Sequence, residues 1–92
     1  KNTQPSAIYN AGSVFKNGPD YYAAELIEKA GLKGYEIDGV KVSEKHSNFF
    51  IASKNAKSIA LYKLVNYVKE EVHRMYNIKL KEEIIFIGDF LD

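Results

Sequence analysis

The segment over residues 56–76 most constrains the fold, because it is long, charged on one side and apolar on the other. Its apolar residues recur three and four positions apart, the spacing that lines one face of an α-helix, and Asn55 precedes it as an N-cap. Such a face is stable only when another layer covers it. The predicted buried stripe consists of Leu61, Leu64, Val65, Val68, Val72 and Met75.

β-prone runs supply the second layer. Residues 35–37 and 40–42 flank Asp38-Gly39, and an Asp-Gly pair between two such runs predicts a β-hairpin with a two-residue type I′ turn. Residues 49–52 form an apolar strand, and residues 83–87 are apolar enough to predict a last strand that is covered on both faces.

The beginning of the chain reads as a linker followed by a short strand. Residues 1–12 are polar and lack an initiator Met, so we interpret the chain as part of something longer. Residues 13–15 are β-prone, and Asn17-Gly18-Pro19 predicts a loop.

A first helix is predicted over residues 20–30. Its apolar positions share one helical face, with Asp20 as the expected N-cap. Gly31 fits the left-handed position after a helix, where Leu32 makes the accompanying apolar contact. The order strand, helix, hairpin, strand, helix, strand predicts an α+β fold. We expect two layers, a mostly antiparallel sheet with two helices packed on one face.

The composition limits the partners and metal sites that the chain is expected to have. The 92 residues suffice for one domain, and 13 basic residues nearly balance 12 acidic ones, which gives a net charge of +1. This balance argues against nucleic acid or an anionic membrane as a partner. There is no cysteine, which excludes disulfides and thiolate metal sites, and two histidines make a weak case for any metal.

Two polar loops have both a functional and a structural interpretation. Ser13, close to Lys16 and Asn17, is either a proton donor or phosphate-contacting hydroxyl, or simply a turn serine beside a solvated lysine. Lys45 and His46 lie between two strands, where they either contact an anion or form a solvated loop.

Glu83 is a third polar position, at the start of an apolar strand. It is either partly buried with a raised pKa or a strand-end charge that faces water. Ser13, His46 and Glu83 contain the residue types of a hydrolase triad, but no G-x-S-x-G elbow accompanies them, and geometry rather than residue type defines a triad.

Taken together, several segments resemble one family. The block over residues 10–17, N-A-G-S-V-F-K-N, resembles a signature of the UDP-N-acetylenolpyruvoylglucosamine reductases, also called UDP-N-acetylmuramate dehydrogenases. Residues 24–35, 42–49 and 80–88 resemble three further blocks of the same family, in the same order and with close spacing. The resemblance implies that residues 13–92 are the C-terminal substrate-binding domain and that the FAD-binding domain is absent.

The resemblance also implies an activity and its partners. The family reduces the enolpyruvyl ether of UDP-N-acetylglucosamine to UDP-N-acetylmuramate in peptidoglycan synthesis, in the bacterial cytoplasm, with FAD and NADPH. This chain alone is expected to fold, to bind no flavin and to lack reductase activity. The missing FAD-binding domain is the implied partner.

The resemblance also implies roles for individual residues of this chain. Ser13 matches the serine that donates a proton to carbon, and Glu83 matches a glutamate that stabilises the enolic carboxylate, so we expect both to meet in one cleft. The resemblance assigns substrate binding to Asn17, which matches a diphosphate-contacting asparagine, and to Lys16, Lys45 and His46. The chain departs from the family pattern at Gly18, Glu36, Asp38 and Glu82.

Two other classes of function remain open from the residues. A non-catalytic α+β binding module would share the hydrophobic pattern, but it would not need Ser13, Asn17 and Glu83 together. A nucleic-acid-binding domain would use the seven tyrosines and the lysines on one sheet face, against the even charge balance.

Overall fold

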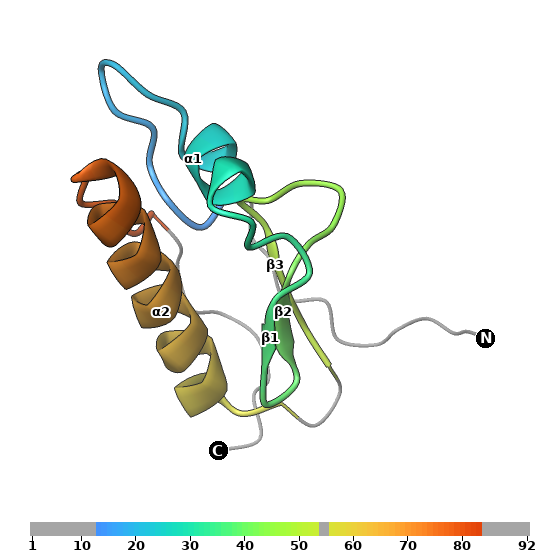
Figure 1. Cartoon of the computed structure of the whole chain (residues 1–92). Helices are drawn as coiled ribbons and strands as arrows, with labels where there is room; N and C mark the ends of the chain where they lie inside the picture. The colour runs from blue at the N-terminus through green and yellow to red at the C-terminus, as the bar shows by residue number, and fades with distance from the viewer. Residues whose placement is uncertain (1–12, 54–55, 84–92) are drawn as a thin grey trace.

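The computed structural model describes residues 13–53 and 56–83 (Figure 1). The elements, in chain order, are α1 (Ala23–Lys29), β1 (Glu36–Ile37), β2 (Val40–Val42), β3 (Phe50–Ala52) and α2 (Ser58–Tyr76). The predicted cap Asn55 and the predicted strand beyond Glu83 lie outside the described residues.

The three strands form an antiparallel sheet in the order β1-β2-β3. Ile37 pairs with Val40 across the hairpin, so Asp38 and Gly39 form a two-residue turn. Both turn residues have positive φ, 47° and 92°, as a type I′ turn requires. The predicted hairpin is therefore confirmed.

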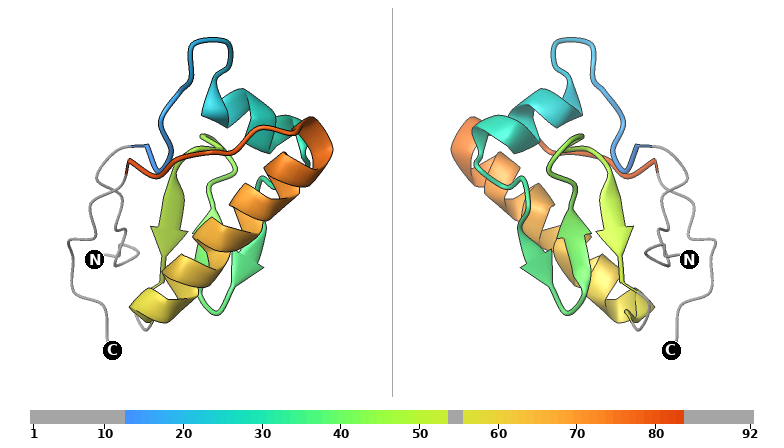
Figure 2. Two further views of the ribbon diagram at one scale, coloured as in Figure 1. Left: turned by 90° about the vertical axis from the view of Figure 1, so that its left-hand side faces the viewer. Right: turned by 90° about the vertical axis from the view of Figure 1, so that its right-hand side faces the viewer.

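Helix α2 covers one face of this sheet, and α1 packs against α2 at one end of the layer (Figures 1 and 2). The predicted α+β fold of two layers is confirmed. Apolar side chains from both helices, β2 and β3 meet in one core with Val14, Phe15 and Leu80.

The predicted stripe of α2 is buried except at Met75, which is 44% exposed. Tyr76, four residues after the buried Val72, packs against the core instead, because a spacing of four keeps a side chain on the same helical face. The helix begins at Ser58 rather than at Ala56, after an N-cap, Lys57, that has no side-chain capping bond.

Helix α1 begins at Ala23, so the prediction of Asp20 as its N-cap was wrong. The Oδ1 atom of Asn17 instead accepts the N–H of Ala23 at 2.9 Å, from six residues earlier in the chain. A turn makes this possible, since the N–H of Gly18 donates to the carbonyl of Tyr21 and folds the chain back.

The end of α1 matches the sequence prediction. Gly31 has φ 77° and its N–H donates to the carbonyl of Glu28, while the N–H of Leu32 donates to that of Ile27. These two bonds define a Schellman motif, and the buried Leu32 provides its apolar contact.

Residues 14–16 run alongside residues 81–83 as a short antiparallel pair outside the sheet. The N–H of Lys16 donates to the carbonyl of Lys81 at 2.9 Å, and the N–H of Glu83 donates to that of Val14 at 2.7 Å. The predicted strand over residues 13–15 is thus realised as an isolated bridge between Phe15 and Glu82.

Candidate functional site

An open cavity of about 640 Å³ lies where the segment from Ser13, α1 and the loop between β2 and β3 meet. Three residues singled out from the sequence contribute to its wall, Ser13 and Asn17 from one segment and His46 from the loop between β2 and β3. The lining residues are Ser13, Asn17, Tyr22, Ala24, Glu25, Glu28, His46, Asn48 and Phe49.

Ser13 is partly exposed and immediately precedes two residues that are almost completely buried, Val14 and Phe15. The buried pair anchors this end of the segment in the core, while Ser13 lines the cavity wall. A hydroxyl held in this way next to an open cavity can donate a hydrogen bond or a proton to a bound ligand.

Asn17 has a structural task that the sequence did not reveal. Its Oδ1 atom caps α1 through the N–H of Ala23. Because an asparagine amide also carries an NH₂ donor, the same side chain can cap the helix and donate to a ligand in the cavity that it lines.

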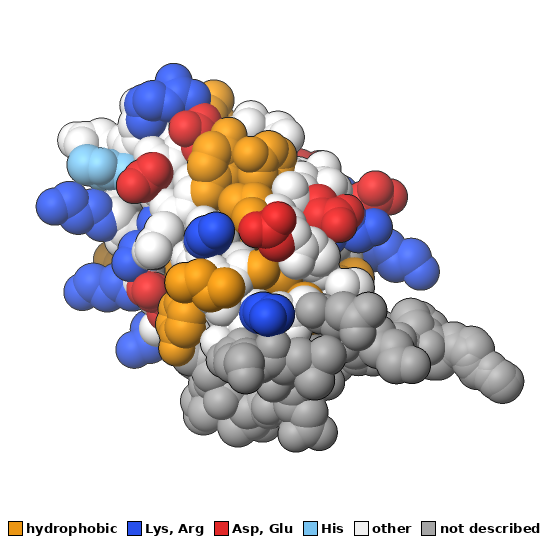
Figure 3. Space-filling view, turned by 90° about the horizontal axis from the view of Figure 1, so that it is seen from below, with side chains coloured by type: hydrophobic (Ala, Val, Ile, Leu, Met, Phe, Trp, Pro, Cys, Tyr) orange, Lys and Arg blue, Asp and Glu red, His pale blue; other side chains and the backbone are white. Residues whose placement is uncertain are grey.

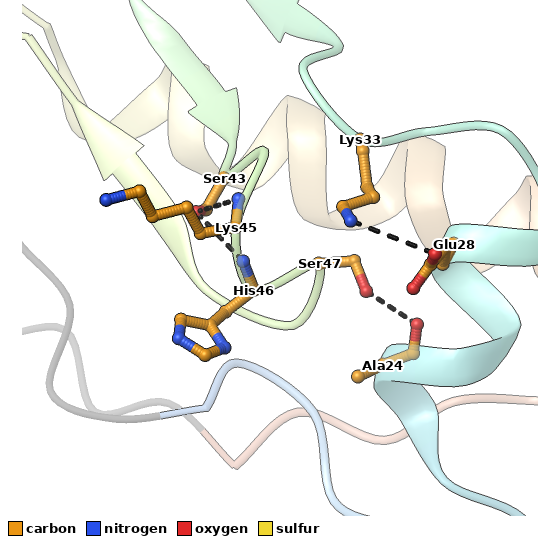
Figure 4. A network of polar contacts seen from close by, with 7 residues as sticks. All are labelled: Ala24, Glu28, Lys33, Ser43, Lys45, His46 and Ser47. Atoms are coloured by element: carbon orange, nitrogen blue, oxygen red, sulfur yellow. Dashed lines mark hydrogen bonds and ion pairs between the residues drawn. The ribbon is translucent and has the colours of Figure 1, made fainter.

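The loop over residues 43–49 is held by local hydrogen bonds (Figure 4). The Oγ atom of Ser43 accepts the N–H groups of Lys45 and His46, at 3.1 and 3.2 Å. The imidazole of His46 points toward the segment that begins at Ser13, and its ring lies 5.4 Å from that of Phe49. Lys45 extends away from that segment and does not line the cavity.

Asn48 has a structural role that no sequence pattern indicated. This residue is only 6% exposed, and its amide group bonds to both the N–H and the carbonyl of Phe15, each at 2.9 Å. The two partners are 33 residues apart, so no local pattern pointed to the contact.

Glu83 is exposed and does not line the cavity, as expected for a strand-end charge that faces water. Its backbone N–H donates to Val14, the neighbour of Ser13, so the two predicted catalytic residues lie on paired segments. Their convergence on one ligand stays a prediction. Lys16 is exposed and also does not line the cavity.

Glu25 and Glu28 line the cavity from α1, a contribution that the sequence analysis also missed. They follow the helical spacing that the sequence showed, but only the fold places this face of α1 opposite His46. Each carboxylate has a surface ion pair, with Lys29 at 3.5 Å and with Lys33 at 3.8 Å.

The described residues do not fit a flavin site or a metal site. A flavin pyrophosphate is typically held by free N–H groups at a glycine-rich turn that leads into a helix, and here the first N–H of α1 already bonds to Asn17. No group of three or more metal-ligating side chains occurs within residues 13–53 and 56–83.

Two features of the structure bear on a membrane or nucleic acid as a partner. In the described part of the chain, neither helix has the length and apolarity needed to cross a bilayer. On the face shown in Figure 3, acidic and basic side chains are interspersed around apolar patches.

The chain has an α+β fold with one antiparallel sheet, and Ser13, Asn17 and His46 are among the residues that line its open cavity. Residues 4–87 match the family model of the UDP-N-acetylenolpyruvoylglucosamine reductase C-terminal domain. The chain belongs to this family.

Similar proteins agree with this assignment. The reductase of Synechocystis is 44% identical over 98% of this chain, and that of Caldanaerobacter subterraneus is 46% identical over 97%. These matches cover 28% and 30% of the two relatives, so the chain spans less than a third of their length. The crystal structure of UDP-N-acetylenolpyruvylglucosamine reductase from Thermus caldophilus superposes with a TM-score of 0.72, at 33% identity, over 83% of this chain and 26% of that one.

Proposed function

We propose that residues 13–92 form the substrate-binding and proton-donating domain of a UDP-N-acetylenolpyruvoylglucosamine reductase, with residues 1–12 as a linker. The whole enzyme reduces the enolpyruvyl ether of UDP-N-acetylglucosamine to UDP-N-acetylmuramate with FAD and NADPH, in bacterial peptidoglycan synthesis in the cytoplasm. The observation that carries the proposal is that Ser13, Asn17 and His46 line one cavity. The rival non-catalytic binding module gives no reason for this convergence.

Ser13 donates the proton in this proposal. Reduction of the enol ether leaves an enolate-like carbon next to the carboxylate, and such a carbon is a strong base. A serine hydroxyl is a very weak acid in water, but it suffices when it is held against so basic a carbon and its alkoxide is promptly reprotonated. In this proposal a flavin bound by the rest of the enzyme supplies the hydride, since residues 13–53 and 56–83 do not fit a flavin site.

Glu83, with its carboxyl group protonated, hydrogen-bonds the enolic carboxylate of the same three-carbon unit, together with an arginine from the FAD-binding domain. Its exposure in this chain leaves it free to face the remaining part of the enzyme, and its backbone bond to Val14 keeps it near Ser13. Asn17 and His46 contact the diphosphate from the cavity wall, and Lys16 and Lys45 add positive charge from outside it.

The test is Ser13→Ala in the whole enzyme, followed by stopped-flow absorbance of the flavin. Reduction of the flavin by NADPH should keep its rate, because this chain takes no part in it. Reoxidation by the enolpyruvyl substrate should slow about 10²–10⁴-fold, as on the loss of a positioned general acid. Ser13→Cys should recover part of the rate, since a thiol also donates a proton.

Ser53→Ala is the matched control, because Ser53 is an exposed serine remote from the cavity lining. It should leave both half-reactions unchanged. Reoxidation in Ser13→Ala within about tenfold of wild type would show that Ser13 is not the proton donor.

A further inference from the structure

Asn48 makes hydrogen bonds to the segment that follows Ser13 of the kind that a neighbouring β-strand would make. Its Oδ1 atom accepts the N–H of Phe15 and its Nδ2 atom donates to the carbonyl of Phe15, both at 2.9 Å. Its main-chain carbonyl accepts the N–H of Val14 at 2.8 Å. One buried residue therefore makes three hydrogen bonds to two consecutive residues.

The other edge of the same segment is bonded to residues 81–83. The carbonyl of Val14 accepts from Glu83, and the N–H of Lys16 donates to Lys81. Residues 14–16 are thus paired on both edges, like a central strand, although they belong to no sheet. Asn48 supplies one of these two edges alone, because a side-chain amide offers the same donor and acceptor pair as a peptide group.

This arrangement links both predicted catalytic residues to Asn48. Val14 donates to Asn48 on one edge and accepts from Glu83 on the other, and it is covalently joined to Ser13. A shift of Val14 would therefore move the hydroxyl of Ser13 relative to the cavity and to Glu83 at once.

We propose that Asn48 is the positioning residue that fixes Ser13 at the cavity wall and sets its place relative to Glu83. The inference rests on the proposed function, since it assigns Asn48 a task in the proton transfer by Ser13. It goes beyond the family assignment, because it concerns the register of the segment and not contact with the substrate.

The fold offers a control beside the test position. Ser47 is 3% exposed and lies in the same loop, but its hydroxyl donates to the carbonyl of Ala24 in α1 and not to the Ser13 segment (Figure 4). Ser47→Ala therefore removes a buried loop anchor without touching the bonds to Val14 and Phe15.

Asn48→Asp gives a readout that a loss of stability alone would not give. An ionised carboxylate keeps the acceptor for the Phe15 N–H, but it repels the Phe15 carbonyl to which the amide donated. A neutral carboxylic acid restores that donor, so the defect should shrink as the pH falls. His46, Glu25 and Glu28 line the same cavity and are present in every variant, so the rate of Asn48→Asp at each pH is divided by the rate of Ser47→Ala at that pH.

The experiment measures flavin reoxidation by the enolpyruvyl substrate at saturation in the whole enzyme, from pH 5 to pH 8, with melting temperatures in parallel. Near pH 8, Asn48→Asp should be roughly 10- to 100-fold slower than Ser47→Ala, as for a misplacement of about 1 Å. The ratio should approach one at low pH, while KM and flavin reduction by NADPH change little.

If the reoxidation rates of Asn48→Asp and Ser47→Ala agree within about twofold at every pH, the proposal is overturned and Asn48 is a stabilising residue only. If Asn48→Asp does not fold, Asn48→Ser buries no charge, removes both side-chain bonds to Phe15 and must show the same slowing. Unchanged reoxidation in Ser13→Ala, by contrast, would overturn the proposed function itself.

Discussion

Asn17 has two tasks in the structure, and two substitutions should separate them. Its Oδ1 atom caps α1 at 2.9 Å from the N–H of Ala23, and the residue also lines the cavity. Asn17→Ala removes the cap and the NH₂ donor together. Asn17→Asp keeps an acceptor for the helix but removes the donor and adds a negative charge.

The stability effects have opposite directions. Loss of an N-cap costs about 1 kcal/mol, which lowers the melting temperature of a domain of this size by about 4–8 °C, so Asn17→Ala should melt that much earlier. Asn17→Asp should melt at or above the wild-type temperature, since a carboxylate near a helix N-terminus adds about 0.3–1 kcal/mol. Asn66→Ala, at an exposed position within α2, is the control and should not lower the melting temperature.

Ligand affinity should fall in both variants. A hydrogen bond to a charged diphosphate contributes about 1.5–3 kcal/mol, so Asn17→Ala should bind UDP-N-acetylmuramate about 10- to 150-fold more weakly in calorimetric titration of the whole enzyme. Asn17→Asp should bind at least as weakly, because its carboxylate repels the diphosphate. If Asn17→Asp has the same lowered melting temperature as Asn17→Ala, the proposed capping of α1 by Asn17 is wrong. If Asn17→Ala binds with the wild-type affinity, the diphosphate contact is refuted.

Two further predictions concern stability. Gly39→Ala should lower the free energy of unfolding in urea more than Gly31→Ala does. Both glycines have positive φ. An added Cβ at Gly39 would lie 2.6 Å from Oγ of Ser53, whereas nothing lies within 4 Å of an added Cβ at Gly31. Each substitution carries the left-handed backbone cost of about 1–2 kcal/mol, and equal losses would contradict the steric argument. The pKa of Tyr67 is raised above 10.0, first by its hydrogen bond with the stacked Tyr35 and then by desolvation. Because the folded-state pKa is raised, this stabilisation is complete below pH 10 and is lost as the pH rises through the folded value. Tyr35→Phe should lower the pKa in an ultraviolet titration, and an unchanged value would exclude the hydrogen bond.

The parts of the fold that the sequence predicted are those that depend on local chemistry. Asp38 and Gly39 can adopt positive φ more readily than other residues, so their order in the chain was enough to place the hairpin. Gly31 marked the end of α1 for the same reason, and the stripe of α2 followed from a spacing of three and four residues.

The errors and omissions arise from contacts between distant residues. Asp20 looked like an N-cap because it precedes the apolar spacing, but a turn at Gly18 brings Asn17 to the helix instead. Asn48 and Ser47 bond to residues 33 and 23 positions away, and an asparagine or serine in a polar loop gives no sign of such a partner. The sequence therefore pointed to Ser13, Asn17 and His46, which line one cavity, but not to the hydrogen bonds that hold its wall.

The charges around the cavity limit which part of the substrate this chain can hold by itself. Glu25 and Glu28 contribute two carboxylates to the wall, and their exposed pairs with lysines are weak, as surface ion pairs are. These two carboxylates therefore weaken the diphosphate contacts proposed for Asn17 and His46, and beside α1 they favour hydrogen-bond donors, such as the hydroxyl and amide groups of a sugar. The neutralising positive charge has to come from beyond the lining residues, from Lys16 and Lys45 or from the rest of the enzyme. In the proposed reductase this chain would then contribute the proton donor, the contacts of Asn17 and His46 and the charges of Lys16 and Lys45, and high affinity for the dianionic diphosphate would require the whole protein.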